Sequence, residues 1–294
     1  MDLMICSMCG AQHSTRAAKS CKVCDDPRQY VPPDGQSWTT LRELQLSGKY
    51  HNTFQHDPYH SGVISIWTEP QVAIGQRAIL CCTDKGNVLW DCITYIDDET
   101  VNRIKDLGGI SAIVISHPHY YSTCLHWAEA FGCSVYLSAE DEEWIMRKGD
   151  AQKLWEGNEM ELLDGEFKVV KVGGHFYGSS VMLWKSEKKL FVADSITVVP
   201  SGVYHVDRPR GTASFTFMWS YPNMIPLAPD LVHGIWQAVA DLDFEDTHGA
   251  FLLKDTRGRS KERLLDSAKM FVNSMGHWEH AIHKETIQPL LATG

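Results

Sequence analysis

Several turns of the sequence end in side chains that bind metal ions in proteins. His117 and His119 flank a single proline directly after a predicted buried strand, so both imidazoles can point at one ion. His175 lies in a glycine-rich turn, Asp194 ends another predicted strand, and His248 follows a third. A histidine pair by itself is also typical of two surface residues in a turn. Because all of these turns carry ligand types, they together predict a metal site.

A second set of candidate ligands lies near the N-terminus. Cys6 and Cys9 form one Cys-x-x-Cys pair, and Cys21 and Cys24 form another after eleven intervening residues. Two such knuckles can close a tetrahedral site of four thiolates, for which we expect a structural metal, zinc before iron. Four free thiols are the alternative. A redox role is disfavoured because neither pair has a thioredoxin-like βαβ context.

The elements that must position these residues form two successive groups of strands and helices. Hydrophobic patterning predicts strands over residues 62–67, 77–82, 87–92, 111–115, 134–137, 160–163, 167–172, 180–185 and 189–193. It predicts helices over residues 97–107, 121–131, 139–148, 230–242 and 261–275. This order indicates an α+β layered fold with sheets inside and helices outside.

Two stretches of the chain interrupt this pattern. Residues 1–36 hold the paired cysteines and end in a turn-rich segment, which predicts a small four-cysteine zinc-ribbon-like knuckle with a linker, followed by one large domain over residues 37–294. A proline- and aromatic-rich loop lies between residues 200 and 229. Its aromatic side chains could line a pocket or pack over the helical layer; they are Phe215, Phe217, Trp219 and Tyr221.

The order of the motifs resembles that of the metallo-β-lactamase-fold hydrolases, from about Trp38 to the C-terminus. The matching elements are Trp90-Asp91, His117-x-His119, Gly174-His175-x-x-Gly178-Ser179, Ala193-Asp194 and His248-Gly249. The resemblance implies a four-layer αββα sandwich with a metal site on one edge, so residues 37–294 would be a metallo-β-lactamase-like hydrolase domain.

The resemblance also implies a role for each candidate ligand. The first metal would be bound by His117, His119 and His175. Asp194 would contact that metal or bridge to a second one, which His248 would help to bind. Asp91 would contact the ligands or the loops that carry them and would not bind the metal itself.

One loop departs from the family pattern. Where the family has His-x-His-x-Asp-His, this chain has His117-Pro118-His119-Tyr120-Tyr121-Ser122, so Tyr121 and Ser122 replace two residues that normally bind the second metal or its water. The loop is similar to that of a subgroup with a HPHYYS-type segment behind an N-terminal double Cys-x-x-Cys. We therefore expect one firmly bound pocket metal and a second site that is weak or absent.

Hydrolysis follows from one such ion. Three neutral imidazoles leave a coordination position open for water, whose pKa falls to about 7 on the metal. Asp194 could orient this water or take its proton. The ion or the phenol of Tyr121 could stabilise the oxyanion of a tetrahedral intermediate, although Tyr121 could equally be a packing aromatic. Zinc is the expected metal, and iron is compatible with the same ligands.

The leading hypothesis is a lactonase- or lactamase-like metal-dependent hydrolase for a small ester, lactone, lactam or thioester. One alternative is a mononuclear iron oxygenase on the same scaffold, which the loss of second-site ligands fits. Another is a non-catalytic metal-binding scaffold. The joint presence of His117, His119, His175 and Asp194 argues against that last alternative, because a decayed site would not be expected to keep all four.

Composition limits the partners. The net charge is −10, the isoelectric point is about 5.7, and no basic cluster stands out, so neither nucleic acid nor an anionic membrane surface is an expected partner. A small-molecule substrate is expected, and a homo-oligomer is compatible with the sequence. No signal peptide or transmembrane segment is apparent, and the nine cysteines are an odd number. These features predict a cytoplasmic protein with reduced thiols.

Overall fold

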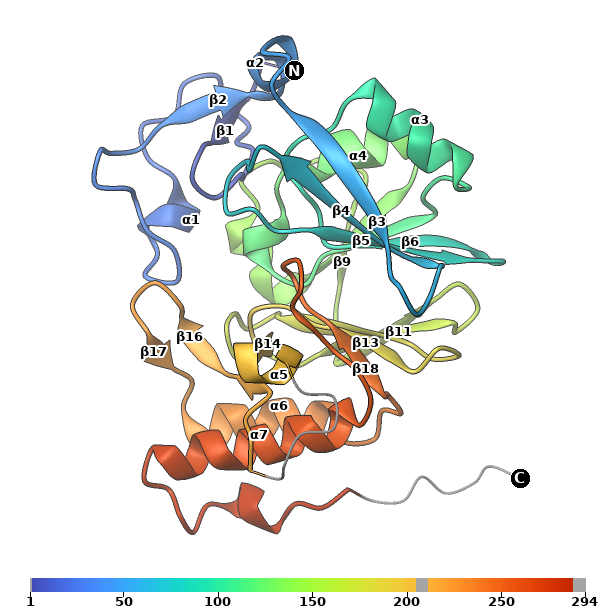
Figure 1. Cartoon of the computed structure of the whole chain (residues 1–294). Coiled ribbons are helices and arrows are strands. Elements are labelled where there is room, and N and C mark those ends of the chain that lie inside the picture. The colour runs from blue at the N-terminus through green and yellow to red at the C-terminus, as the bar shows by residue number, and fades with distance from the viewer. Residues whose placement is uncertain (1, 205–210, 288–294) are drawn as a thin grey trace. The chain divides into compact units, whose positions relative to one another are not determined.

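The computed structural model describes residues 2–204 and 211–287 of the 294-residue chain (Figure 1). The chain divides into two compact units, Met1–Glu156 and Gly157–Gly294, and each is described by itself. Among the described residues, none of the helices is both long enough and apolar enough to cross a membrane.

The first unit is built around a mixed sheet. Its strands are β3 (His51–His56), β4 (Val63–Glu69), β5 (Ala78–Thr83), β6 (Gly86–Trp90), β7 (Ala112–Val114), β8 (Ser134–Ser138) and β9 (Gln152–Trp155). They lie in sequence order across the sheet. The pairs from β3 to β6 are antiparallel, whereas those from β6 to β9 are parallel. The parallel part needs crossovers, which helices and turns supply.

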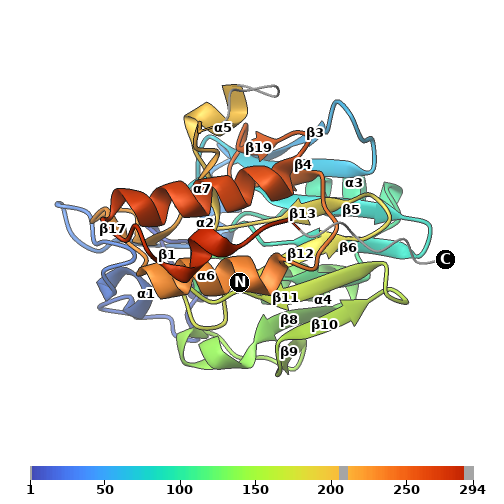
Figure 2. The same ribbon diagram turned by 90° about the horizontal axis from the view of Figure 1, so that it is seen from below.

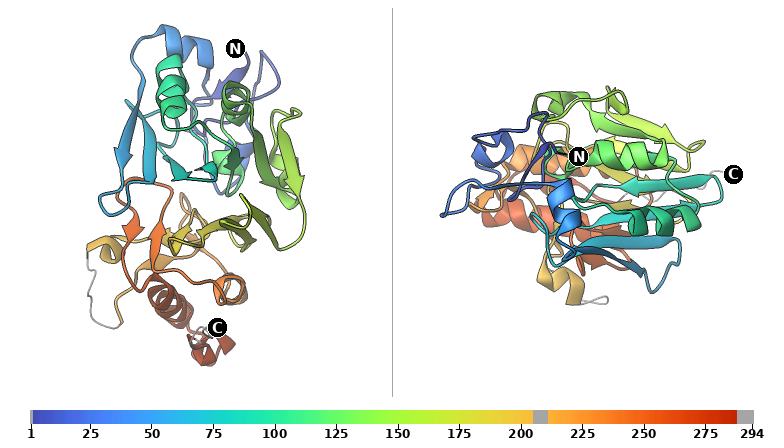
Figure 3. Two further views of the ribbon diagram at one scale, coloured as in Figure 1. Left: turned by 90° about the vertical axis from the view of Figure 1, so that its right-hand side faces the viewer. Right: turned by 90° about the horizontal axis from the view of Figure 1, so that it is seen from above.

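Helices of the first unit lie mainly on one face of this sheet (Figure 3). The helical segments are α1 (Lys22–Asp25), α2 (Leu41–Leu46), α3 (Asp98–Asp106) and α4 (Cys124–Phe131), with 3₁₀ turns η1 (Pro118–Tyr120) and η2 (Ala139–Trp144). Helix α3 begins where predicted, because the Asp97 side chain accepts a hydrogen bond from the amide of Thr100. It ends before Gly108, whose φ of +102° is accessible to glycine.

The N-terminal segment pairs with residues just beyond the predicted linker. Strand β1 (Met4–Cys6) is antiparallel to β2 (Trp38–Thr40), with Cys6 opposite Trp38. Helix α2 follows at once and has a capping box between Thr40 and Glu43. The domain boundary after residue 36 stays a prediction, and the β1–β2 ladder joins its two sides.

The second unit repeats the scheme of one sheet with helices. Its sheet runs in the order β10 (Glu159–Leu162), β11 (Phe167–Lys171), β12 (Ser180–Trp184), β13 (Lys189–Phe191), β18 (Asp246–His248) and β19 (Asp255–Thr256). Only β13 and β18 are parallel neighbours. The remaining elements are β14 (Thr197–Val198), α5 (Pro200–Tyr204), β15 (Phe215–Thr216), β16 (Met218–Ser220), β17 (Ile225–Pro226), α6 (Pro229–Val239), α7 (Ser260–Ser274) and η3 (Ala281–Lys284). Each unit thus contains one large sheet with helices, besides small two-stranded sheets.

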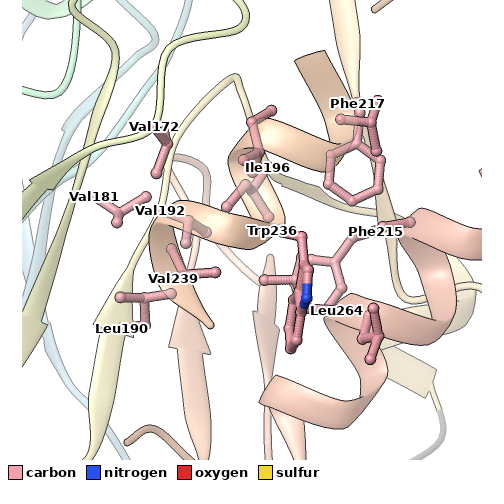
Figure 4. Packing of buried hydrophobic residues seen from close by; sticks show 14 of the residues in the cluster. Val172, Val181, Leu190, Val192, Ile196, Phe215, Phe217, Trp236, Val239 and Leu264 are labelled. Atoms are coloured by element: carbon pink, nitrogen blue, oxygen red, sulfur yellow. The ribbon is translucent and has the colours of Figure 1, made fainter. Parts of the chain in front are cut away.

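The core of the second unit lies between its sheet and the helices α6 and α7, which run side by side (Figure 2). Trp236 and Val239 on α6 are fully buried with Val192 from the sheet and Leu264 from α7 (Figure 4). Phe215 and Phe217 belong to the same cluster, and Trp219 packs against it. These aromatics of the predicted loop are therefore core residues. The part of that loop at residues 205–210 lies outside the described residues.

Two local predictions were wrong, and one strand was not predicted. The helix expected from residue 121 starts at Cys124, because Ser122 has a φ of +43° that no α-helix allows. The helix expected over residues 139–148 is only the 3₁₀ turn η2 (Ala139–Trp144), because the backbone of Asp141, with φ −105° and ψ 15°, is not helical. The polar segment around His51 forms the edge strand β3, which was not predicted. Its backbone hydrogen bonds to β4 hold it in the sheet, and its side chains are too polar to show a hydrophobic pattern.

Candidate metal centre

The four N-terminal cysteines come together in the first unit. All four side chains are buried, and their sulfur atoms lie within 4.8 Å of one another. The Cys6 and Cys24 sulfurs are 3.4 Å apart, and those of Cys9 and Cys21 are 3.6 Å apart. Four thiolates on a tetrahedral zinc ion, each with a bond of about 2.3 Å, would be roughly 3.8 Å apart. The cluster therefore fits a metal ion closely.

The protonation of these thiols is shared among them. A hydrogen bond from Cys24 lowers the pKa of Cys21, whereas the hydrogen bond with Cys21 raises the pKa of Cys9. The side-chain amide of Gln36 also donates to the sulfur of Cys6 at 3.1 Å, which supports a thiolate there. Thiols that already share protons in this way release them when a metal binds. No sequence motif singles out Gln36, because its role depends on the fold of the knuckle.

His117 and His119 lie side by side on the loop after β7. Both are 2% exposed, and their ring centroids are 5.0 Å apart. Two imidazoles bound to one tetrahedral ion through nitrogen bonds of 2.0–2.1 Å would have centroids about 5 Å apart. Pro118 starts the turn η1 between them, and its fixed φ suits the first position of a helical turn. This loop therefore presents two imidazoles in a spacing that suits one ion.

Neighbouring side chains orient this histidine pair. The hydroxyl of Ser116 is 2.9 Å from Nδ1 of His117, which leaves Nε2 as the nitrogen available for a ligand bond. Asp91, at the end of β6, accepts a hydrogen bond from the Ser116 amide at 2.7 Å. The carboxylate thus fixes the loop that carries the histidines, as the resemblance implied for Asp91.

Tyr121 and Ser122 stand in the next turn of this loop. The Tyr121 hydroxyl is 3.5 Å from the backbone carbonyl of Asp141, and burial raises the pKa of this phenol well above its usual value. These are the contacts of a packing residue, and its catalytic role stays a prediction. Ser122 accepts hydrogen bonds from the backbone amide of Gln12 and from the side chain of Gln76.

The second unit holds His175 and Asp194 close together. His175 Nε2 is 3.7 Å from an Asp194 carboxylate oxygen, and the imidazole is fully buried. This distance exceeds a hydrogen bond but approaches the separation of about 3.4 Å between two ligand atoms on one tetrahedral ion. The backbone carbonyl of Met218 is 3.2 Å from Nδ1, where it accepts the ring proton and directs Nε2 toward the carboxylate.

Backbone geometry explains the glycine before His175. Gly174 has a φ of +87°, and a Cβ there would lie 2.9 Å from Ile235 and 3.0 Å from Leu227. The turn can therefore pack against the core only with glycine at this position. The Ser195 hydroxyl then ties the turn to the Asp194 loop, because it accepts from the His175 amide and donates to the Gly173 carbonyl.

Tyr221 holds the other side of the Asp194 loop. Its hydroxyl donates to the Asp194 carbonyl at 2.8 Å and is 2.6 Å from the Thr197 hydroxyl. Its ring lies 5.9 Å from that of His175. The sequence predicts Tyr221 only as one of the loop aromatics that line a pocket or pack over the helical layer, since nothing in it pairs Tyr221 with Asp194.

His248 ends β18 and is 1% exposed. Its ring stacks on Phe191 of the neighbouring strand at 5.2 Å. Its Nδ1 is 3.5 Å from an oxygen of Asp255, and its Nε2 is 3.4 Å from the guanidinium of Arg257. The arginine was not singled out in the sequence.

The chain is similar to known proteins in both sequence and fold. A scan against protein-family models gives no match. The chain is 39% identical over 281 residues to the uncharacterized protein YmaE of Bacillus subtilis (strain 168), covering 94% of this chain and 97% of YmaE. The chain belongs to the YmaE family.

Solved structures identify the fold of this YmaE-family protein. The DIM-1 metallo-β-lactamase matches with a TM-score of 0.54 and 14% identity, over 75% of this chain and 98% of DIM-1. VMB-1 matches with a TM-score of 0.56 and 12% identity, over 76% and 98%. The metallo-β-lactamase FIM-1 of Pseudomonas aeruginosa, in its mono-zinc form, matches with a TM-score of 0.51 and 15% identity, over 76% and 96%. The chain therefore has the metallo-β-lactamase fold, which confirms the predicted fold class.

Within this YmaE-family chain, the predicted histidine and aspartate ligands lie at the ends of strands or in the turns that follow them. The structure brings together the four cysteines, the pair His117 and His119, and the pair His175 and Asp194. It adds residues that sequence analysis missed, namely Ser116, Ser195, Gln36 and Arg257. Each of these acts through a hydrogen bond to a predicted residue or to the loop that carries it.

Proposed function

We propose that the chain is a metal-dependent hydrolase that uses one ion bound by His117, His119 and His175. The proposal requires the ligand loops of the two units to share this ion, as the metallo-β-lactamase fold implies. The observation that carries it is the pair His117 and His119, buried and oriented by Ser116 in a spacing that suits a tetrahedral ion. Zinc is the proposed metal, and the mono-zinc form of FIM-1 shows that this fold works as a scaffold for a single zinc ion.

When bound, such an ion lowers the pKa of a coordinated water to about 7 and supplies a nucleophile at neutral pH. The residues of the chain then have separate tasks. Asp194 accepts the proton of the attacking water, since its carboxylate lies beside His175. Hydrogen bonds from Tyr221 and to Ser195 fix the backbone around Asp194, so the carboxylate keeps its position during the reaction.

The proposed substrate is a small ester, lactone, lactam or thioester. Each of these has a carbonyl carbon that hydroxide can attack, and each passes through a tetrahedral intermediate. The proposed role of the four-cysteine cluster is structural, because four protein ligands fill a tetrahedral zinc site and leave no position for water.

The test is metal content measured on purified protein by mass spectrometry, together with hydrolysis of a panel of small esters, lactones, lactams and thioesters. We expect about two zinc ions per chain, one in each site. His119→Ala should lose one of them and all hydrolysis, whereas the exposed control His56→Ala should keep both. Retention of both ions by His119→Ala would overturn the proposal. Stoichiometric iron with oxygen uptake would replace it with an oxygenase.

A further inference from the structure

The second unit carries an arginine at the place where the family resemblance calls for a second metal. We infer that Arg257 occupies the ligand nitrogen of His248 and thereby restricts the pocket to a single ion. The inference rests on the proposed function and goes beyond it, because it assigns a residue that determines the number of metal ions.

Strand topology places His248 beside the Asp194 loop. Strands β13 and β18 are parallel, with Phe191 opposite His248, and the amide of Val192 donates to the His248 carbonyl. Asp194 therefore follows the end of the strand next to the one that His248 ends. Ligands commonly bind at the carboxyl ends of parallel strands, so these two residues are placed where a second ion would be bound.

The ring of His248 has its Nε2 lone pair engaged by Arg257. Its Nδ1 lies 3.5 Å from the Asp255 carboxylate, which favours the proton on that nitrogen. Nε2 is then the acceptor, and the Arg257 guanidinium lies 3.4 Å from it. A guanidinium only donates and stays charged at all physiological pH values. A metal ion would need the same lone pair and would meet a fixed positive charge.

Two carboxylates hold Arg257 in this place. Its guanidinium lies 3.7 Å from Asp246 and 3.6 Å from Asp255. Asp246 also accepts hydrogen bonds from the Gly258 amide and from the Lys189 ammonium, each at 2.9 Å. Lys189 and Arg257 together balance Asp246 and Asp255. A divalent cation at His248 would be repelled by the Arg257 guanidinium, which lies 3.4 Å from Nε2.

The metal loop of the first unit also lacks the usual ligands for a second ion. Tyr121 and Ser122 stand where the family pattern has an aspartate and a histidine for the second ion. The loss of those ligands and the engagement of His248 are independent features, and both disfavour a second ion.

The experiment is zinc titration of protein whose four-cysteine cluster is loaded and whose pocket has been emptied, followed by calorimetry. Cobalt titration with absorption spectroscopy provides a second count of pocket ions. Wild-type protein should bind one pocket ion. Arg257→Met should bind a second ion at least roughly 100-fold more tightly than wild type, because the charge is gone and the Nε2 lone pair is freed. Arg257→Lys, which keeps the charge, should still bind one.

Two controls separate the possible outcomes. Arg259→Met removes an exposed arginine two positions away that pairs with Glu262, and it should behave as wild type. If Arg257→Met does not fold, Arg257→Gln carries the same test because it also lacks the charge. A folded variant that still stops at one ion overturns the inference and leaves the proposed function intact. Wild-type protein without any pocket ion overturns both.

Discussion

The four-cysteine cluster and the histidine donors offer metal ligands in contrasting ways. The cysteines come from a short segment of one unit and need no residue outside it. The histidines come from loops after two different strands, β7 and β11, and hydrogen bonds from elsewhere in the fold hold these loops in place. A local, saturated ligand set is typical of a structural site, whereas dispersed donors that leave a position open are typical of a catalytic one.

The largest expected effect concerns the four-cysteine cluster and tests whether it is a structural metal site. Cys21→Ser should remove the cluster metal and lower the free energy of unfolding by about 4 kcal/mol, the stabilisation that a ligand at 1,000 times its Kd provides. Urea denaturation and zinc content measure the two effects. Cys133→Ser, outside the cluster, should stay within about 1 kcal/mol of wild type. If Cys21→Ser keeps its zinc, the cluster is not a metal site.

Asp194→Asn tests the proposed catalytic role of the Asp194 carboxylate. The amide keeps the size of the side chain but cannot accept the proton of water, so kcat should fall by about 100- to 1,000-fold. Stability should change little, in contrast to the cysteine variant. Steady-state kinetics and denaturation on the same preparation show whether the two properties separate. An unchanged kcat would remove Asp194 from the proposed machinery.

A pH effect on stability tests the contact between the knuckle and helix α4, which carries His126. Burial, followed by the charge of Arg147, lowers the pKa of His126 to about 4, and Gln12 of the knuckle lies 3.1 Å from its ring. The unfolded chain takes up this proton below its usual pKa of about 6.5. The contribution is therefore complete above pH 6.5 and is lost as the pH falls toward 4, at a cost of up to about 3 kcal/mol.

The matched variant for this experiment is His126→Gln, which keeps a polar side chain near Gln12 but does not titrate. Carboxylates elsewhere in the chain also titrate between pH 6.5 and 4. The informative quantity is therefore the difference in unfolding free energy between wild type and His126→Gln. The wild-type unfolding free energy should fall more steeply over this range. Parallel curves would show that His126 is not held neutral in the folded state.

The smallest expected effect concerns Tyr221. Tyr221→Phe removes the hydroxyl that bonds the Asp194 carbonyl and Thr197, which should cost about 1 kcal/mol of stability. We also expect kcat to fall while metal content is kept, because the Asp194 loop loses one of its supports. Tyr177→Phe is the control, since that ring is 85% exposed. Equal effects of the two variants would remove the proposed positioning role.

Features that depend on residues a few positions apart could be predicted from the sequence. Features that depend on hydrogen bonds between distant residues could not. The hairpin of β5 and β6, helix α3 and the ligand turns were found because hydrophobic patterning, capping residues and glycine act within a few positions. Strand β3 was missed because an exposed edge strand shows no burial pattern. Arg257 was missed because its significance lies in the nitrogen it contacts, which only the tertiary structure reveals.

The hydrogen bond from the Gln12 amide to the Ser122 carbonyl matters for protein engineering. A truncated chain starting at residue 37 would lack this bond, the Gln12 contact with His126 and the whole partner of strand β2. The loop that carries both histidines would then lose a hydrogen bond that holds its Ser122 end. A shortened chain is therefore a poor substitute for the 294-residue chain in crystallisation or activity screening.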